Sequence, residues 1–95
     1  MAPIRRLVLD LLKPRDPSTL VFAQEMADLD GISGVNAALV EVDEEVENVK
    51  LTIEGEDVDF DAVEETAKTL GGTLHSTDLV ACGDRLVEEI ETPQD

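Results

Sequence analysis

The sequence predicts an α+β fold in which strands and helices follow one another in the order β-α-β-β-α-β, and three patterns lead to this prediction. The longest is strand-like alternation from residue 34 to residue 55, interrupted by an acidic run over residues 43–48 that suits a turn. Segments with apolar residues at helical spacing lie on both sides of this hairpin. Shorter alternating stretches lie near the start of the chain and after the second helical segment.

The first strand is expected over residues 4–12, because large apolar side chains occur on both of its alternating faces. One face is apolar throughout and comprises Leu7, Leu9 and Leu11. The other face is mixed and comprises Arg6, Val8, Asp10 and Leu12. Apolar groups on both faces are typical of a strand at the centre of a sheet. Lys13-Pro14 then ends the strand, since proline has no N–H to donate to a ladder.

The first helix is expected to begin at Asp16-Pro17, with Asp16 as the N-cap acceptor and Pro17 at the first helical position. Its buried stripe recurs at helical spacing and comprises Phe22, Ala23, Met26, Ala27 and Leu29. Asp30-Gly31 closes the helix, because glycine adopts the left-handed cap conformation without strain.

In the hairpin, alternation assigns one set of side chains to a core and the other to solvent. The core set is rich in β-branched residues and comprises Val40, Val42, Val49, Leu51 and Ile53. The outward set is mostly polar and comprises Glu41, Asp43, Lys50 and Thr52.

The second helix is expected to begin near Asp59 or Asp61 and to run to about Leu70. Its apolar face comprises Phe60, Val63, Ala67 and Leu70. Two glycines stop this helix, and a fourth strand follows from Thr73 to about Cys82.

Right-handed crossovers convert this order into a ferredoxin-like sandwich, with an antiparallel sheet ordered 4-1-3-2 and both helices on one face. The other face would stay bare, with His75 and Thr77 of the fourth strand on it. Its apolar residues would be exposed in a monomer and comprise Val8, Leu12, Ala37 and Leu39. Such a surface on a small domain usually marks an interface, so we expect a homo-oligomer.

The chain is expected to form a single domain over residues 1–95, with a core over about residues 3–82. Gly83-Asp84 suits a two-residue turn into a short strand or an arm over residues 83–91. Residues 92–95 would form a loose tail.

The net charge of −16, from 23 acidic and 7 basic residues, is the dominant feature of the composition. The acids are scattered, and 42% of the residues are apolar, which is typical of a folded domain and not of a disordered acidic tail. A salt-rich cytoplasm explains such a charge, because the Debye length is only ~3 Å at about 1 M salt. Nucleic acid binding is disfavoured, because the chain has no basic patch and its aromatic residues are two phenylalanines.

No membrane span is expected, because no apolar run approaches the roughly 20 residues that cross a bilayer. The sequence begins directly with a strand pattern, which speaks against a signal peptide. Cys82 is the single cysteine, which excludes an intrachain disulfide and favours a reducing cytoplasm. Because an isolated cysteine usually behaves as a small apolar residue, we expect Cys82 to be buried.

Several short segments carry a family resemblance that extends over nearly the whole chain. They are, in order, Val8-Leu9-Asp10 with Leu12-Lys13-Pro14, Gly34-Val35-Asn36, Glu47-Asn48 with Lys50 and Thr52-Ile53, Asp59-Phe60-Asp61, Gly71-Gly72, His75-Ser76 with Asp78, Val87-Glu88-Glu89 and Thr92-Pro93-Gln94-Asp95. Together they resemble the archaeal domain-of-unknown-function family 211 (DUF211). The resemblance implies a ferredoxin-like fold, an archaeal cytoplasmic origin and a multimeric, ring-like assembly, and it implies no established activity. The many acids and few lysines point to a haloarchaeal member.

The candidate chemistry centres on a histidine and carboxylates. Asp10 and His75 would share the bare face if the first and fourth strands are neighbours, and an imidazole beside carboxylates suits a divalent metal or an acid–base pair. We take Asp10, His75, Asp78 and Asp43 as candidate metal ligands, although alternation separates Asp78 from His75 unless a bulge intervenes. In the simpler alternative, Asp10 pairs with a basic residue and His75 donates a hydrogen bond at a subunit interface.

The acidic turn over residues 43–48 offers oxygen atoms that suit Ca²⁺ or Mg²⁺, without the spacing of an EF-hand. No catalytic residue is assigned, because the serines have no nucleophile elbow and the chain has one histidine.

The sequence thus favours a non-enzymatic, cytoplasmic module that assembles with copies of itself and binds a divalent cation or a small ligand at subunit interfaces. A regulatory partner subunit that senses a small molecule is the alternative, by analogy of fold. A small acid–base enzyme using His75 and Asp10 is the third hypothesis.

Overall fold

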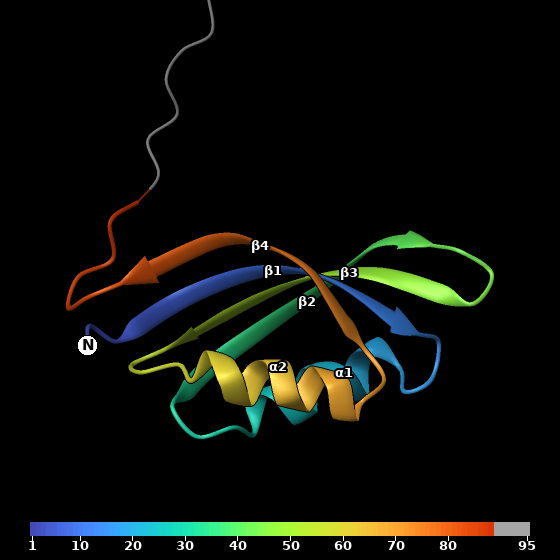
Figure 1. Cartoon of the computed structure of the whole chain (residues 1–95), viewed down its shortest axis with the longest axis horizontal. Coiled ribbons are helices and arrows are strands. Elements are labelled where there is room, and N and C mark those ends of the chain that lie inside the picture. Colours follow the sequence, from blue (N-terminus) through green and yellow to red (C-terminus); the bar gives the residue numbers. More distant parts are fainter. Residues whose placement is uncertain (89–95) are drawn as a thin grey trace, which may run out of the picture.

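The strands and helices of the computed structural model follow the predicted order, and the structure describes residues 1–88. The elements are β1 (Ile4–Pro14), α1 (Thr19–Ala27), β2 (Ile32–Val42), β3 (Val46–Gly55), α2 (Phe60–Thr69) and β4 (Thr73–Cys82). The sheet is antiparallel with strand order β2-β3-β1-β4, and both helices lie under one of its faces (Figure 1). The ferredoxin-like fold, the strand order and the one-sided placement of the helices are therefore confirmed.

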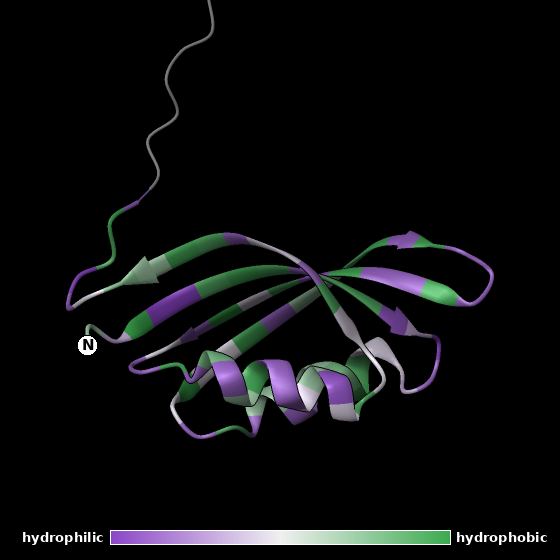
Figure 2. Ribbon diagram, viewed as in Figure 1, coloured by the Kyte–Doolittle hydropathy of each residue, from purple (hydrophilic) through white to green (hydrophobic). Residues whose placement is uncertain are grey.

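The core lies between the sheet and the two helices. Its largest part comes from the facing sides of β1 and β3, which contribute Leu7, Leu9, Leu11, Val49, Leu51 and Ile53. The helices and the segment before α2 add Phe22, Met26, Val58, Val63 and Ala67. Hydrophilic and hydrophobic bands alternate along the strands, as expected where only one face is covered (Figure 2). Each large apolar side chain buried in this layer contributes about 1.5–3 kcal/mol.

Both helices begin at a side-chain cap. In α1 the cap is Ser18, whose hydroxyl accepts a hydrogen bond from the Val21 amide at 3.2 Å. The prediction of Asp16 as the cap is wrong by two residues, because Ser18 has the extended backbone and the short oxygen side chain that the position needs. In α2 the cap is Asp59, one of the two predicted residues, and it accepts from the Ala62 amide at 3.1 Å.

The end of α1 differs from the prediction. The helix stops at Ala27 with Asp28 as its C-cap. Ala27 is exposed, and only Phe22 and Met26 of the predicted stripe are fully buried. Gly31 does have a positive φ of 84°, but it uses this conformation at the entry to β2.

Simple alternation assigns the faces of β2 the wrong way round as far as Leu39, whereas Val42 pairs with Glu47 on the predicted helix side although its side chain is exposed. Val40 and Val42 are 57% and 55% exposed, whereas Val35 and Ala37 pack against the core. The register between β2 and β3 shifts after Leu39, so Val40 is an extra residue and the alternation changes phase there. Ala37 and Leu39 pair with buried residues of β3 and lie on the helix side, so their predicted place on the bare face is wrong.

The segment after β4 begins with contacts to the start of β1. The Gly83 amide donates to the Pro3 carbonyl at 2.9 Å, and the Arg5 guanidinium donates to the Gly83 and Asp84 carbonyls. Residues 83–88 contain no strand, and the rest of the predicted arm and the predicted tail lie outside the described residues.

Gly55 approaches the turn before β2 so closely that a side chain cannot fit. A Cβ at position 55 would lie 1.9 Å from the Gly31 carbonyl oxygen. We expect Gly55→Ala to lower the free energy of unfolding by about 2 kcal/mol or more, as overpacking does. Urea titration at fixed salt and protein concentration measures this.

Gly34→Ala is the matched control, because a Cβ at position 34 meets nothing within 4 Å. Its free energy of unfolding should change by no more than about 0.5 kcal/mol. Equal losses in the two variants would show that the contact between residues 55 and 31 does not limit the fold.

Candidate functional site

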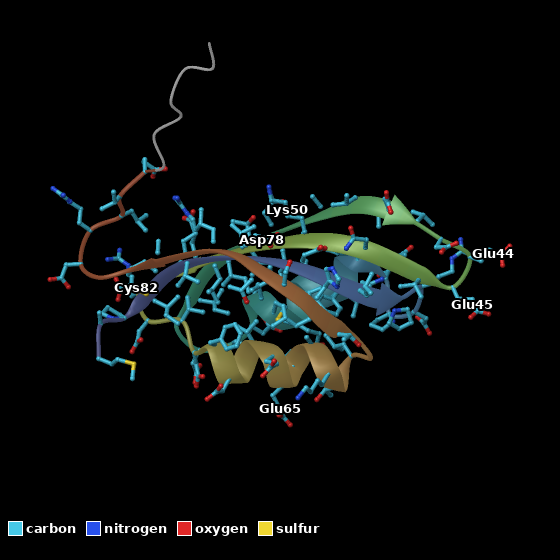
Figure 3. All side chains as sticks on the ribbon, turned by 45° about the horizontal axis from the view of Figure 1, so that its top comes forward. Glu44, Glu45, Lys50, Glu65, Asp78 and Cys82 are labelled. Atoms are coloured by element: carbon cyan, nitrogen blue, oxygen red, sulfur yellow. The ribbon has the colours of Figure 1, made fainter. Side chains whose placement is uncertain are left out.

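The side of the sheet that no helix of residues 1–88 covers, which we call the helix-free face, carries polar residues singled out in the sequence. Cross-strand register places the following residues on it: Arg6, Val8, Asp10 and Leu12 of β1, Asn48, Lys50, Thr52 and Glu54 of β3, Asn36, Ala38 and Glu41 of β2, and Ser76, Leu79 and Ala81 of β4. In Figure 3, Lys50 points away from the helices and Glu65 of α2 lies on the opposite side of the molecule. The predicted bare side of β1 is thus confirmed.

An ion pair and a groove occupy one end of the helix-free face. Arg6 Nε donates to Glu54 Oε2 at 2.7 Å, and Arg6 Nη1 lies 3.5 Å from Glu88 Oε2. The hydrogen bond that Arg6 donates to Glu54 raises the pKa of Arg6, although desolvation opposes this rise. A groove of about 680 Å³ lies beside the pair and is lined by Arg6, Asp78, Leu79, Val80, Ala81, Cys82, Val87 and Glu88. The segment after β4 therefore lies against this end of the face.

Hydrogen bonds between side chains cross the middle of the face. Asn48 Nδ2 donates to the Asp10 carboxylate and to the Leu11 carbonyl oxygen. Ser76 lies opposite Asp10 in the register and donates its hydroxyl to Asp78 Oδ1 at 2.7 Å. Ser76 therefore pairs across the strands with Asp10 and is hydrogen-bonded to Asp78. The sequence analysis did not name Ser76 as a site residue.

His75 does not lie opposite Asp10. The register between β1 and β4 shifts on both sides of Ser76, so His75 and Asp78 are extra residues at irregularities of the strand. The predicted placement of Thr77 on the bare face is wrong for the same reason, because Thr77 pairs with Leu9 on the helix side. His75 itself is exposed at the edge of the sheet.

Asp43 lies in the turn between β2 and β3, where its Oδ1 accepts from the Glu44 amide at 2.8 Å. It also lines a hollow of about 290 Å³ with Leu12, Glu41, Val46 and Asn48. Residues 1–88 contain no group of three or more His, Cys, Asp or Glu side chains that could hold a metal ion. The four predicted ligands are therefore not brought together as such a group within one chain.

Two further predictions concern the cysteine and the membrane. Cys82 is exposed, so its predicted burial is wrong; it is the last residue of the edge strand β4 and lines the groove beside Arg6. Across residues 1–88, every helix is too short or too polar to cross a bilayer.

A buried ion pair on the helix side joins β1 to β3. The Lys13 side chain is 0% exposed, and its Nζ lies 2.6 Å from Glu47 Oε1 and 2.9 Å from the Pro14 carbonyl oxygen. Sequence reasoning missed this pair, although Lys13 continues the alternating series of buried leucines in β1. A buried ammonium group needs such partners, because leaving one charge unpaired costs about 3–5 kcal/mol.

A double-mutant cycle tests the buried pair. Glu47→Leu should lower the free energy of unfolding by about 3 kcal/mol, because it leaves the Lys13 ammonium group uncompensated, and Lys13→Met is the other single variant of the cycle. The double variant Lys13→Met with Glu47→Leu should recover most of this loss, since two apolar groups need no partner. Independent, additive losses in denaturant titrations would contradict the coupling.

Comparison with known proteins finds a matching family model and a similar archaeal protein. Residues 5–95 match the family model for DUF211, whose description is "Uncharacterized ArCR". The chain is also 50% identical over 95 residues to the uncharacterized protein MJ0319 of Methanocaldococcus jannaschii, and the alignment covers 100% of this chain and 98% of that protein. The chain therefore belongs to the DUF211 family.

Proposed function

We propose that this protein is a non-enzymatic module that assembles into a homo-oligomer through its helix-free face and binds a divalent cation or small ligand where subunits meet. The observation that carries the proposal is the one-sided cover of the sheet. Both helices lie under the same face, and the other face of the central strand β1 presents Val8 and Leu12 without a covering layer among the described residues (Figure 1). Exposed apolar surface on a small domain usually marks a contact with another chain.

The charges of the helix-free face support self-association. Together with Asp78, the face carries two basic and four acidic side chains, a net charge of −2, whereas the whole chain has a net charge of −16. Three of these acids accept a hydrogen bond from a neighbour on the same side: Glu54 from Arg6, Asp10 from Asn48 and Asp78 from Ser76. Copies of a strongly acidic chain repel one another least where few uncompensated acids meet.

A divalent cation would supply positive charge at the boundary between two acidic subunits. Carboxylate oxygens from Asp10, Asp43 and Asp78 are the ligands that Ca²⁺ and Mg²⁺ prefer, and the His75 imidazole could add a nitrogen ligand. No group of three such side chains forms within residues 1–88 of one chain, and a second subunit at the boundary would complete the ligand set.

A leucine replacement on each side of the molecule tests the assembly surface. Leu12→Glu should raise the dissociation constant of the oligomer by about tenfold or more, because it adds a charge to the helix-free face. Leu20→Glu is the control, since Leu20 is 68% exposed on α1 and a change there should leave the assembly unaltered. Sedimentation velocity at high salt measures both, and a wild-type chain that stays monomeric would remove the proposal.

The cation is tested separately by native mass spectrometry with Ca²⁺ or Mg²⁺. Asp43→Asn should weaken cation retention by the oligomer on the order of tenfold, because affinity depends on the number of charged ligands. Glu65→Gln removes one acid from the far side of the molecule and should leave retention unchanged (Figure 3). Equal retention by the two variants would exclude Asp43 as a ligand.

A further inference from the structure

The edge strand β2 contains a long stretch without charge. Residues 32–40 read Ile-Ser-Gly-Val-Asn-Ala-Ala-Leu-Val and contain neither a charged residue nor a proline. In a chain with 32% charged residues, nine positions would be expected to include about three. One side of β2 pairs with β3, and within the described residues no strand pairs with its other side.

An uncharged edge is unusual because edge strands attract other strands. Proteins normally protect such edges with charges, prolines or irregular backbone, since unpaired N–H and C=O groups form a template for another chain. Both edge strands have register shifts, two in the β2–β3 pairing and three in the β1–β4 pairing, but β4 also has exposed titratable side chains at His75 and Asp78, with Asp84 just after it. The edge of β2 is therefore the one without charge, and its register is regular from Gly34 to Leu39, which are the features of a pairing surface.

We propose that β2 pairs antiparallel with β2 of a second copy of this chain, around a two-fold axis perpendicular to the sheet. The two four-stranded sheets then become one sheet of eight strands in the order β4-β1-β3-β2-β2-β3-β1-β4. This inference rests on the proposed self-association and names the edge through which two subunits join. The two helix-free faces lie on the same side of the joined sheet and form one larger surface.

Charge identifies the second copy as the partner strand. Two chains of net charge −16 approach most easily where neither contributes a charge, and pairing of the 32–40 stretch with itself meets this condition on both sides. Pairing of β2 with β4 of a neighbour would instead bring in the charge of Asp78. A symmetric contact of one patch with itself is also the commonest way in which soluble proteins form dimers.

The proposed two-fold axis constrains the register between the two copies of β2. Opposed residues in an antiparallel pair must share a face of the sheet, so one residue of β2 must lie directly opposite its own copy. Opposed Cα atoms are about 4.5–5.5 Å apart, which is within the range of about 4.4–6.8 Å that a disulfide requires.

Single cysteines introduced at each of residues 33–39, in a Cys82→Ser background, test this statement. After oxidation in high salt, we expect one position to give disulfide-linked dimers at least about tenfold faster than its immediate neighbours, which lie on the other face. Single cysteines at Thr77 and Val80, which are exposed on β4, are the matched controls and should give no dimers.

Amide hydrogen exchange of the unmodified chain provides a second measurement that needs no variant. Exchange over β2 should slow as the protein concentration rises, while exchange over β4 should not change. Slower exchange or cross-links at β4 alone, in a chain that sedimentation shows to be oligomeric, would overturn the β2 pairing and leave self-association standing.

A monomeric chain without β2 cross-links would overturn both proposals. Cross-links at β2 combined with an unaltered oligomer in Leu12→Glu would support the strand pairing and remove the helix-free face as the assembly surface.

Discussion

The central strand β1 has one face that water does not reach and one face that no helix or strand of residues 1–88 covers, and the rest of the architecture follows from this asymmetry. Its leucines, Leu7, Leu9 and Leu11, pair in register with buried residues of β3 and contact the helix layer. Both crossovers of a right-handed βαββαβ chain bring their helices to the same side, so two helices can seal only one face of the sheet. The helix-free face is therefore a product of topology, and its side chains decide what the protein can contact.

The order of the elements, the sheet topology and the faces of β1 could be predicted from the sequence, because β1 has one alternating set that is apolar throughout. The faces of β2 could not be predicted in this way. Both of its alternating sets contain aliphatic residues, with Val35 and Ala37 on one and Val40 and Val42 on the other. The register shift after Leu39 then changes the phase of the alternation, and no residue type marks such a shift.

The positions of the candidate site residues could be predicted only where the strands are regular. Asp10 lies on the expected face because β1 is regular, whereas His75 and Asp78 lie at irregularities of β4 that period-2 reasoning does not foresee. The Lys13–Glu47 pair could have been found from register alone, since Lys13 follows the buried series in β1. Buried lysines are rare, however, so a lysine that follows an apolar series is expected to be exposed unless a partner is known.

The Lys13–Glu47 pair differs from the Arg6–Glu54 pair in its access to dissolved ions. Arg6 and Glu54 meet at the surface, where a salty solvent weakens their attraction over a few ångströms. Lys13 is enclosed, so mobile ions cannot come between it and Glu47. The inner link between β1 and the β2–β3 hairpin should therefore hold equally well in dilute buffer and in brine, while the outer link loosens as salinity rises.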